Sequence, residues 1–245
     1  MENKTQKKQL IIIPAYNEEE NILNTVNDII EHSPDTDYIV INDCSKDNTI
    51  QVLQENRIPY LSLPSNLGIG GGVQTGYRYA YAKGYDIAVQ FDGDGQHQAR
   101  YLKDLIRPVA DETADIAIGS RFLEKEGFQS TGLRRFGIRF LSGVIHTLCG
   151  VRVLDVTSGM RAVNRRFIRE YAEHYAQDYP EPEALLYAGL RGATIKEVPV
   201  QMQERQSGKS SISAFKSIYY MIKVSLALVL GRITYGKRKE AQGEP

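Results

Sequence analysis

The sequence predicts an α/β fold in which a mostly parallel central sheet lies between two layers of helices. Two observations lead to this prediction. Short apolar runs alternate with helical patterns through the first half of the chain, and such alternation is typical of parallel strands joined by helical crossovers. The chain has 245 residues, of which 42% are hydrophobic and 24% charged, as expected for one α/β domain with at most a short appendage.

Five short apolar runs in the first half are predicted to be strands, at residues 10–13, 38–41, 60–63, 87–91 and 116–118. Helical patterns are expected between them at residues 18–32, 45–56 and 76–83. Ser45 is the residue expected to cap the second of these helices, and Gly84 to end the third.

The second half is less regular. Residues 134–148 and 183–190 are expected to be helical, and residues 194–205 to form a strand. Apolar side chains recur at helical spacing from residue 212 to residue 233. We therefore predict a main domain at residues 1–211, followed at residues 212–245 by an amphipathic helix and a basic tail.

Composition and charge exclude several classes of protein. Lys and Arg together number 30, as do Asp and Glu, so there is no basic excess and we expect no nucleic-acid partner. Cys44 and Cys149 do not form a C-x-x-C motif, which argues against a zinc cluster or a disulfide scaffold. Segment 1–9 is unlike a signal peptide, and no apolar run approaches the roughly 20 residues that span a bilayer. A cytoplasmic protein fits these features.

Polar segments follow three of the predicted strands at the point where each strand ends. They are Tyr16-Asn17-Glu18, Asn42-Asp43 and Asp92-Gly93-Asp94. Ligands of parallel sheets bind beyond the carboxyl ends of the strands. These segments are therefore expected to share one edge of the sheet and to form the binding site.

The segment Asp92-Gly93-Asp94 is the candidate metal site. Two carboxylates two residues apart can face one cation where glycine lets the backbone turn, and such hard oxygen ligands suit Mg²⁺ or Mn²⁺. Gln96 and His97 could extend the set of ligands. A solvated turn is the alternative interpretation. An EF-hand is excluded, because its sixth position would be His97 instead of glycine and its twelfth Lys103 instead of glutamate.

Three further segments are candidates for contact with a ligand. Asp43 follows a strand and could accept hydrogen bonds from a base or ribose. The glycine-rich segment 66–72 precedes a helix and could bring backbone amides to a phosphate, or it could be a flexible turn. The segment 203–211 contains Arg205 and Lys209 and could close on a diphosphate, or it could be a solvated basic loop.

Taken together in their order along the chain, these segments resemble family 2 glycosyltransferases of the Rossmann-like GT-A fold. Among these, the dolichyl- and polyprenyl-phosphate sugar synthases are the most similar. The resemblance covers about residues 10–211. The residues that carry it are Pro14-Ala15-Tyr16-Asn17-Glu18, Asn42-Asp43-Cys44-Ser45, Asn66-Leu67-Gly68, Asp92-Gly93-Asp94-Gly95-Gln96-His97, Gly119-Ser120-Arg121, Thr157-Ser158-Gly159-Met160-Arg161, Glu197-Val198-Pro199-Val200, Arg205 and Gly208-Lys209-Ser210.

The resemblance implies a role for each matching residue. Asp92, Asp94 and Gln96 would hold a Mg or Mn ion, with Asp94 also essential for catalysis. Arg205 and Lys209 would meet the diphosphate, and Arg205 would assist its departure. The residues expected to bind the nucleotide sugar or the acceptor are Pro14, Tyr16, Glu18, Asp43, Asn66, Gly68, Asp92, Arg121, Arg205 and Lys209.

The resemblance also implies the reaction. A sugar would move with inversion from a UDP- or GDP-linked donor to a polyprenyl phosphate or a cell-envelope glycan, with help from the metal. A hydroxyl acceptor needs a general base, for which Glu181 and Glu183 are the candidates; an anionic lipid phosphate needs none. Asn42 replaces the first member of the family's Asp-Asp pair, which leaves the nucleobase less certain.

Two questions stay open at this point. The helical pattern at residues 212–233 is either a core helix or an amphipathic helix on the inner face of the cell membrane, where basic residues meet anionic headgroups. The alternative functions are a sugar-phosphate nucleotidyltransferase and a non-catalytic nucleotide-sugar-binding protein. The nucleotidyltransferase ranks lower, because Pro14-Ala15-Tyr16-Asn17-Glu18 stands where such enzymes have a glycine-rich loop.

Overall fold

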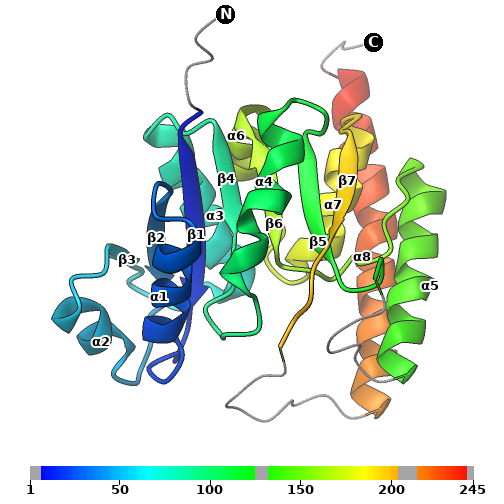
Figure 1. The fold of residues 1–245 in the computed structure, drawn as a ribbon. Coiled ribbons are helices and arrows are strands. Elements are labelled where there is room, and N and C mark those ends of the chain that lie inside the picture. The colour runs from blue at the N-terminus through cyan, green and yellow to red at the C-terminus, as the bar shows by residue number, and fades with distance from the viewer. Residues whose placement is uncertain (1–6, 125–131, 204–213, 242–245) are drawn as a thin grey trace, which may run out of the picture.

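The computed structural model describes residues 7–124, 132–203 and 214–241. Its centre is a seven-stranded sheet in the order β3-β2-β1-β4-β6-β5-β7. Neighbouring strands are parallel, except that β6 is antiparallel to both β4 and β5. Helices cover both faces of the sheet (Figure 1). The predicted three-layer α/β/α fold with a mostly parallel sheet is confirmed.

The elements follow one another with short connections. The first half contains β1 (Gln9–Ala15), α1 (Ile22–His32), β2 (Asp37–Asn42), α2 (Thr49–Glu55), β3 (Tyr60–Ser62), α3 (Gly68–Ala82) and β4 (Ile87–Gln90). The second half contains the 3-10 helix η1 (Ala99–Tyr101), α4 (Leu102–Ala110), β5 (Ile116–Ser120), α5 (Gly132–Cys149), β6 (Arg161–Asn164), α6 (Arg165–Glu173), α7 (Pro180–Leu190), β7 (Ile195–Pro199) and α8 (Ala214–Ala241).

The sheet divides the apolar interior into two cores. In β1, Leu10 and Ile12 face the core under α3, α6 and α7, whereas Ile11 and Ile13 face the core under α1 and α4. All four are almost completely buried, because successive side chains of a strand point to opposite faces and both faces are covered. This two-sided burial explains why the strand is a continuous apolar run.

Several elements of the fold differ from the sequence predictions. Helix α3 begins at Gly68, eight residues before the predicted start at Gly76. Strand β7 ends at Pro199 and not near residue 205. The predictions contain no strand at β6, which has only four residues and is polar at both ends, and no helix at α4 or α6. For β6, contacts distant in sequence decide the structure over local preference.

The glycines of α3 let the helix approach its neighbours closely. A Cβ atom on Gly76 would lie 2.1 Å from Cγ2 of Ile12 in β1, and one on Gly70 would lie 2.2 Å from the carbonyl oxygen of Ala176. A helix interior normally disfavours glycine. Here the close packing offsets that cost, and it explains why a glycine-rich segment is helical and not a loop.

Helix α8 packs against α5 and α7, and Figure 1 shows α5 and α8 side by side at the end of the sheet next to β7. Val224 and Leu228 of α8 are fully buried. One face of α8 is therefore part of the core. The predicted domain boundary at residue 211 lies outside the described residues and stays a prediction.

The packing of α3 gives a test of the fold. We expect Gly76→Ala to lower the free energy of unfolding by about 1–3 kcal/mol, because the new methyl group overlaps Ile12. Gly143→Ala is the matched control: it also lies inside a helix, but its Cβ would meet nothing within 4 Å. This control should be neutral or stabilising by up to about 1 kcal/mol. Urea denaturation of both variants measures the difference, and equal midpoints would contradict the packing argument.

Candidate active site

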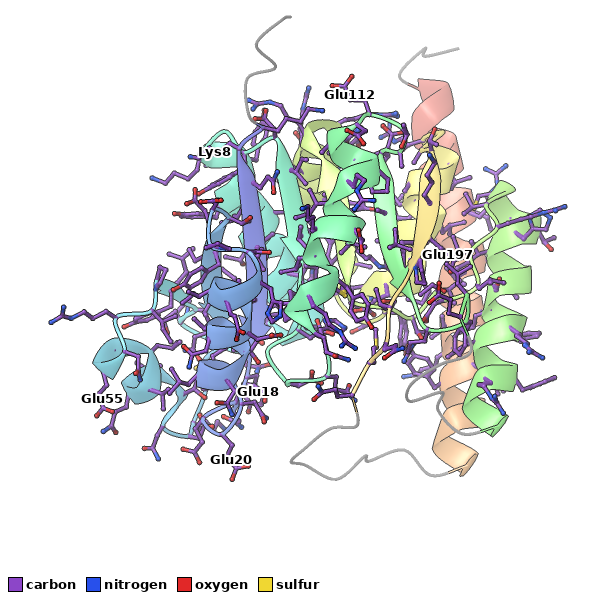
Figure 2. All side chains as sticks on the ribbon, viewed as in Figure 1. Lys8, Glu18, Glu20, Glu55, Glu112 and Glu197 are labelled. Carbon is purple, nitrogen blue, oxygen red and sulfur yellow. The ribbon has the colours of Figure 1, made fainter. Side chains whose placement is uncertain are left out.

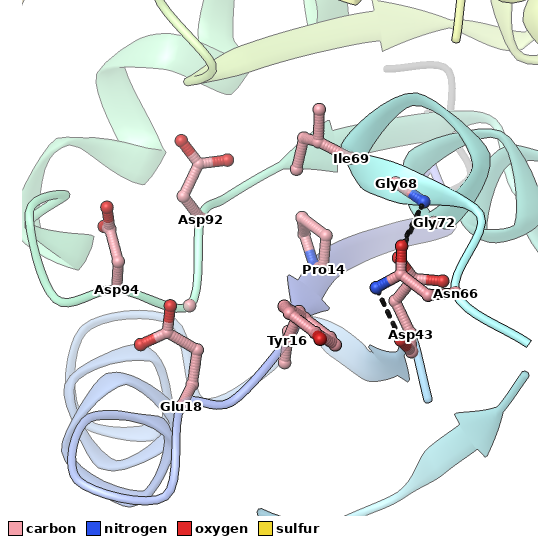
Figure 3. Close-up of a pocket in the computed structure, with 12 residues that line it drawn as sticks. Pro14, Tyr16, Glu18, Asp43, Asn66, Gly68, Ile69, Gly72, Asp92 and Asp94 are labelled. Atoms are coloured by element: carbon pink, nitrogen blue, oxygen red, sulfur yellow. Dashed lines mark hydrogen bonds between the residues drawn. The ribbon is translucent and has the colours of Figure 1, made fainter. Parts of the chain in front are cut away.

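A cavity of about 440 Å³ opens at the carboxyl ends of β1, β2 and β4 (Figure 3). These three strands are adjacent and parallel, so the polar segments that follow them meet at one edge, as predicted. The residues that line the cavity are Pro14, Ala15, Tyr16, Glu18, Asp43, Asn66, Gly68, Ile69, Gly72, Asp92, Gly93 and Asp94.

The loop after β1 is held by the loop after β2 through reciprocal hydrogen bonds. The backbone N–H of Asn17 donates to the Ser45 hydroxyl over 3.0 Å, and the Asn17 side-chain oxygen accepts from the N–H of Lys46 over 2.8 Å. The N–H of Glu18 donates to the Thr49 hydroxyl over 2.9 Å. The prediction that Ser45 caps α2 is therefore wrong, because its hydroxyl fixes the neighbouring loop that carries Tyr16 and Glu18 into the cavity.

Asp43 fixes the start of α3 on the other side of the cavity. Its two carboxylate oxygens accept hydrogen bonds from the backbone N–H groups of Leu67, at 2.7 Å, and Gly68, at 2.8 Å. Gly68 has a φ of +75°, which favours glycine at this position. The amides at the beginning of α3 thus lie at the cavity wall, where the positive end of a helix attracts anions.

Asn42 has a structural role. It is fully buried. Its amide donates to the Ser62 hydroxyl over 2.9 Å, and its side-chain oxygen accepts from the N–H of Ser45 over 3.3 Å. It does not line the cavity. The Asn42 amide therefore links β2 to its neighbour β3. An aspartate at this position has no N–H group to donate to Ser62.

Asp92 and Asp94 follow β4 and line the cavity on the side away from Asp43 (Figure 3). The Asp92 side chain is 31% exposed, whereas Asp94 is 8% exposed and one of its oxygens accepts from the N–H of Gln96 over 3.1 Å. The His97 ring accepts from the N–H of Asp92 through Nδ1, and its Nε2 lies 3.6 Å from the Asp92 carboxylate. This arrangement makes His97 a support for Asp92 more than a metal ligand.

The donor set fits Mg²⁺ or Mn²⁺ bound with substrate. Within the described residues, no group of three or more His, Cys, Asp and Glu could hold a metal by itself. Asp92 and Asp94 nevertheless line one cavity with Glu18, and a hard cation often takes one or two carboxylates, waters and substrate phosphates. Gln96 lies beside this cavity without lining it, and its role as a ligand stays a prediction.

Arg121 has an internal partner. Its guanidinium makes two hydrogen bonds of 2.7 Å to the Asp155 carboxylate and one of 3.1 Å to the Thr157 hydroxyl. Both Arg121 and Asp155 are buried. The pair fixes the loop that leads into β6, and substrate binding by Arg121 stays a prediction. Arg205 and Lys209 lie outside the described residues.

The two candidate bases lie in the first turn of α7. Burial raises the pKa of Glu181, the charge of Asp92 raises it further, and Arg161 and Gln90 act in the opposite direction. Burial and Asp178 raise the pKa of Glu183. Glu181 is therefore the candidate base that interacts electrostatically with Asp92.

Arg161 and Gly159 belong to a motif of the family resemblance that carries no expected role, and both shape the site. Arg161 is 2% exposed, and its guanidinium donates to the backbone oxygens of Ser158, Val156 and Glu181. It thereby joins the loop before β6 to the start of α7. A Cβ atom at Gly159 would lie 2.5 Å from a carboxylate oxygen of Asp92, so only glycine lets Asp92 lie there undisturbed.

Comparison with known proteins agrees with this geometry. Residues 10–172 match the family described as Glycosyl transferase family 2. The chain is 31% identical to a UDP-N-acetylglucosamine–dolichyl-phosphate N-acetylglucosaminyltransferase of Methanococcus voltae, with coverage of 90% of this chain and 97% of that protein. It is also 31% identical to the polyprenol monophosphomannose synthase of Mycolicibacterium smegmatis, with coverage of 93% and 89%.

Solved structures show the same fold. Glucosyl-3-phosphoglycerate synthase from Mycobacterium tuberculosis, in complex with Mn²⁺, UDP and phosphoglyceric acid, superposes with a TM-score of 0.71 at 18% sequence identity. The match covers 93% of this chain and 78% of that one. The family match spans more than half of the chain, and two relatives exceed 30% identity over most of their length. The chain therefore belongs to glycosyl transferase family 2 and is a glycosyltransferase.

Proposed function

We propose that this enzyme transfers a sugar, with inversion, from a UDP- or GDP-linked donor to a polyprenyl phosphate. The observation that supports this most is the convergence of Asp92, Asp94 and the start of α3 on one cavity. Carboxylates and helix amides there provide a place for a cation and a diphosphate. The acceptor class follows from the relatives, whose names specify dolichyl phosphate or polyprenol.

In the proposed reaction, a phosphate oxygen of the acceptor attacks the anomeric carbon of the sugar. The bond from that carbon to the diphosphate oxygen breaks, and the nucleoside diphosphate leaves with the electron pair. A divalent cation held by Asp92 and Asp94 would stabilise the charge of the departing diphosphate. Tyr16 and Asp43 would contact the nucleoside, and the first turn of α3 would face the donor at Ile69, since the Gly68 amide already donates to Asp43. The chain's similarity to sugar transferases argues against the nucleotidyltransferase and non-catalytic alternatives.

The proposed acceptor is a lipid, and the outer face of α5 and α8 fits a membrane surface. No helix in the described part of the chain meets the length and hydropathy needed to cross a membrane. Among the described side chains of these two helices, the large apolar ones that are exposed are Phe136, Phe140, Ile222, Leu226, Val229, Leu230 and Ile233. Exposed cations accompany them at Arg135, Arg139, Lys223 and Arg232.

The basic residues around this apolar face favour an anionic partner. Residues 132–149 contain no Asp or Glu, and residues 214–241 contain a single Glu, whereas both stretches are rich in Lys and Arg. A second copy of the chain would bring like charges together, but anionic lipid headgroups would be attracted. We therefore place the enzyme peripherally on the inner face of the cell membrane, with α5 and α8 in the interface.

The metal site has a direct test. We expect Asp94→Ala to lower kcat by about 10²–10³-fold or more, because the cation that stabilises the leaving group loses a ligand. Calorimetric titration with UDP and GDP, with and without Mn²⁺, should show metal-dependent binding that this variant weakens. Asp104→Ala is the control, since Asp104 is a half-exposed aspartate on α4. Metal-independent binding in the wild type would contradict the proposal.

The role of Glu181 separates the two classes of acceptor. A phosphate acceptor is already anionic, so Glu181→Gln should lower kcat by less than about tenfold. A general base for a hydroxyl acceptor would contribute about 10²–10⁴-fold. The assay uses a polyprenyl phosphate and, in parallel, an uncharged glycan. A loss of about 10²-fold or more with the lipid phosphate would assign Glu181 as a base and contradict direct attack.

Membrane contact can be tested without disturbing the core. The double variant Ile222→Gln/Leu226→Gln changes only exposed side chains, and we expect it to reduce sedimentation with vesicles that contain phosphatidylglycerol. Binding should also fall with added salt, because the headgroup attraction is screened. Ile30→Gln is the control: Ile30 is similarly exposed, but on α1. Two results would contradict membrane binding through α5 and α8. One is wild-type binding to neutral vesicles at high salt that equals binding to anionic vesicles, and the other is unchanged binding by the double variant.

A further inference from the structure

We propose that Gln90 is a positioning residue that sets the affinity of the site for its divalent cation. Its side-chain amide restrains the carboxylate of Asp92 and is itself held by Tyr175. The inference rests on the proposed function and deepens it, because it assigns a residue that supports the metal site without touching the substrate.

Gln90 stands in an unusual place for an amide. It is the last residue of β4, whose other members are Ile87, Ala88 and Val89, and it is completely buried. In the sheet it is paired with Ile12 on one side and with Arg161 on the other. A buried amide without hydrogen-bond partners destabilises a protein, so its partners explain its presence.

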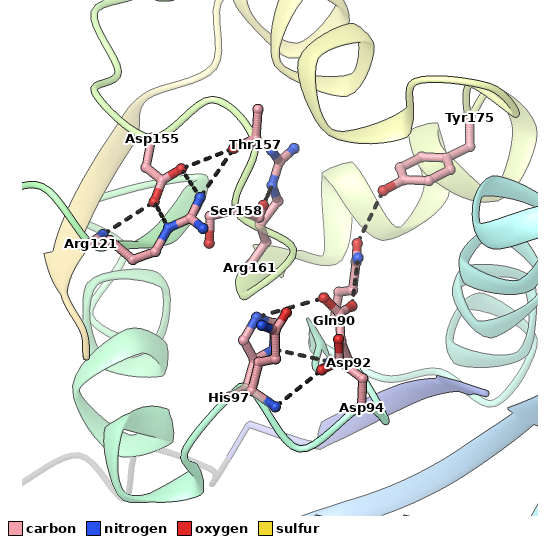
Figure 4. A network of polar contacts seen from close by, with 11 residues as sticks. Gln90, Asp92, Asp94, His97, Arg121, Asp155, Thr157, Ser158, Arg161 and Tyr175 are labelled. Atoms are coloured by element: carbon pink, nitrogen blue, oxygen red, sulfur yellow. Dashed lines mark hydrogen bonds and ion pairs between the residues drawn. The ribbon is translucent and has the colours of Figure 1, made fainter. Parts of the chain in front are cut away.

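Those partners fix the direction of the amide. The Tyr175 hydroxyl donates to Oε1 of Gln90 over 3.2 Å, and Nε2 of Gln90 donates to Oδ1 of Asp92 over 3.3 Å (Figure 4). Only the NH₂ end can donate to a carboxylate, and only the oxygen can accept from a hydroxyl. The opposite orientation would place Oε1 against the Asp92 carboxylate.

The other described neighbours of the Asp92 carboxylate do not hold it in place by hydrogen bonds. On one side its Oδ2 lies over the backbone of Gly159, where a Cβ atom would come within 2.5 Å. On another, Nε2 of His97 lies 3.6 Å away, beyond hydrogen-bond distance. Among the described residues, Oδ1 of Asp92 accepts its side-chain hydrogen bond from the Gln90 amide. The carboxylate stays partly exposed toward the cavity, where a cation can reach it.

The hydrogen bond to Oδ1 holds the Asp92 carboxylate in the position where it lines the cavity. Loss of this donor would let the carboxylate rotate. Groups that support metal ligands in this way contribute about 10–100-fold to metal affinity or activity.

The test uses Gln90→Met, which keeps the length of the side chain and removes its hydrogen bonds. We expect the Mn²⁺ dissociation constant of the UDP complex, measured by electron paramagnetic resonance, to rise by about 10–100-fold. The Mn²⁺ concentration for half-maximal activity should rise in parallel, and saturating Mn²⁺ should restore most of kcat. A purely structural defect would lower kcat at all Mn²⁺ concentrations in proportion to the folded fraction.

Two further variants complete the design. Gln74→Met is the matched control, because Gln74 is a buried glutamine that donates to the backbone oxygen of Ala172; we expect wild-type Mn²⁺ affinity. Tyr175→Phe removes the hydroxyl that orients Gln90 and keeps the ring in the core. It should weaken Mn²⁺ binding in the same direction, but less. This variant retains a readout if Gln90→Met does not fold.

The possible outcomes distinguish failure of the Gln90 proposal from failure of the proposed function. Wild-type Mn²⁺ affinity in both Gln90→Met and Tyr175→Phe, together with weaker affinity in Asp92→Asn, would overturn the role of Gln90 and leave the proposed function intact. Equal losses in Gln74→Met and Gln90→Met would overturn it as well. No Mn²⁺ binding by the wild-type UDP complex would overturn both proposals.

Discussion

The parallel alignment of β2, β1 and β4 is the constraint on which the rest of the site depends. Each of these strands is apolar and covered on both faces, so their polar residues are confined to the strand ends. Because the strands run in the same direction, the polar ends meet at one edge. Packing of the core thus brings Glu18, Asp43 and Asp92 around one cavity without any need for direct contacts between them.

The opposite edge of the sheet, at the amino ends of the parallel strands, also collects polar residues, but these form ion pairs with one another. A second cavity of about 520 Å³ lies there among Lys7, Asp86, Glu112 and Arg165, and Lys8 and Glu112 mark that end in Figure 2. Its charged groups pair mostly with one another, as in the ion pairs of Lys7 with Glu112 and of Arg165 with Asp86. Near the active site, in contrast, the Asp92 and Glu181 carboxylates have no ion pair with Lys or Arg among the described residues.

Much of the fold and the location of the site could be predicted from the sequence, because both depend on local patterns. Continuous apolar runs identify buried strands, and the acidic residues after them identify the edge. These patterns predict Asp92 and Asp94 as site residues, and both line the cavity. The short strand β6 was missed, because its pairing with β4 and β5 lies far away in sequence and its four residues carry no periodicity.

The roles of individual polar residues were harder to predict, since they depend on three-dimensional partners. Ser45 stands before a helix like a cap, but accepts a hydrogen bond from the neighbouring loop. Arg121 matches a family motif, but forms a buried pair with Asp155. Gln90 left a readable signal, a glutamine at the end of an apolar strand. Only the structure shows that Tyr175 and Asp92 are its partners.

The reversed direction of β6 has a consequence for how such an enzyme can diversify. The parallel strands contribute the loops that leave them, whereas β6 contributes the loop that enters it, which contains Ser158 and Gly159 next to Asp92. The two walls of the site therefore belong to separate stretches of chain, joined to each other by the sheet. A change in one wall is therefore not passed along the chain to the other. Gly159 is the point where the segment before β6 touches Asp92, so that segment can vary only where it leaves this contact in place.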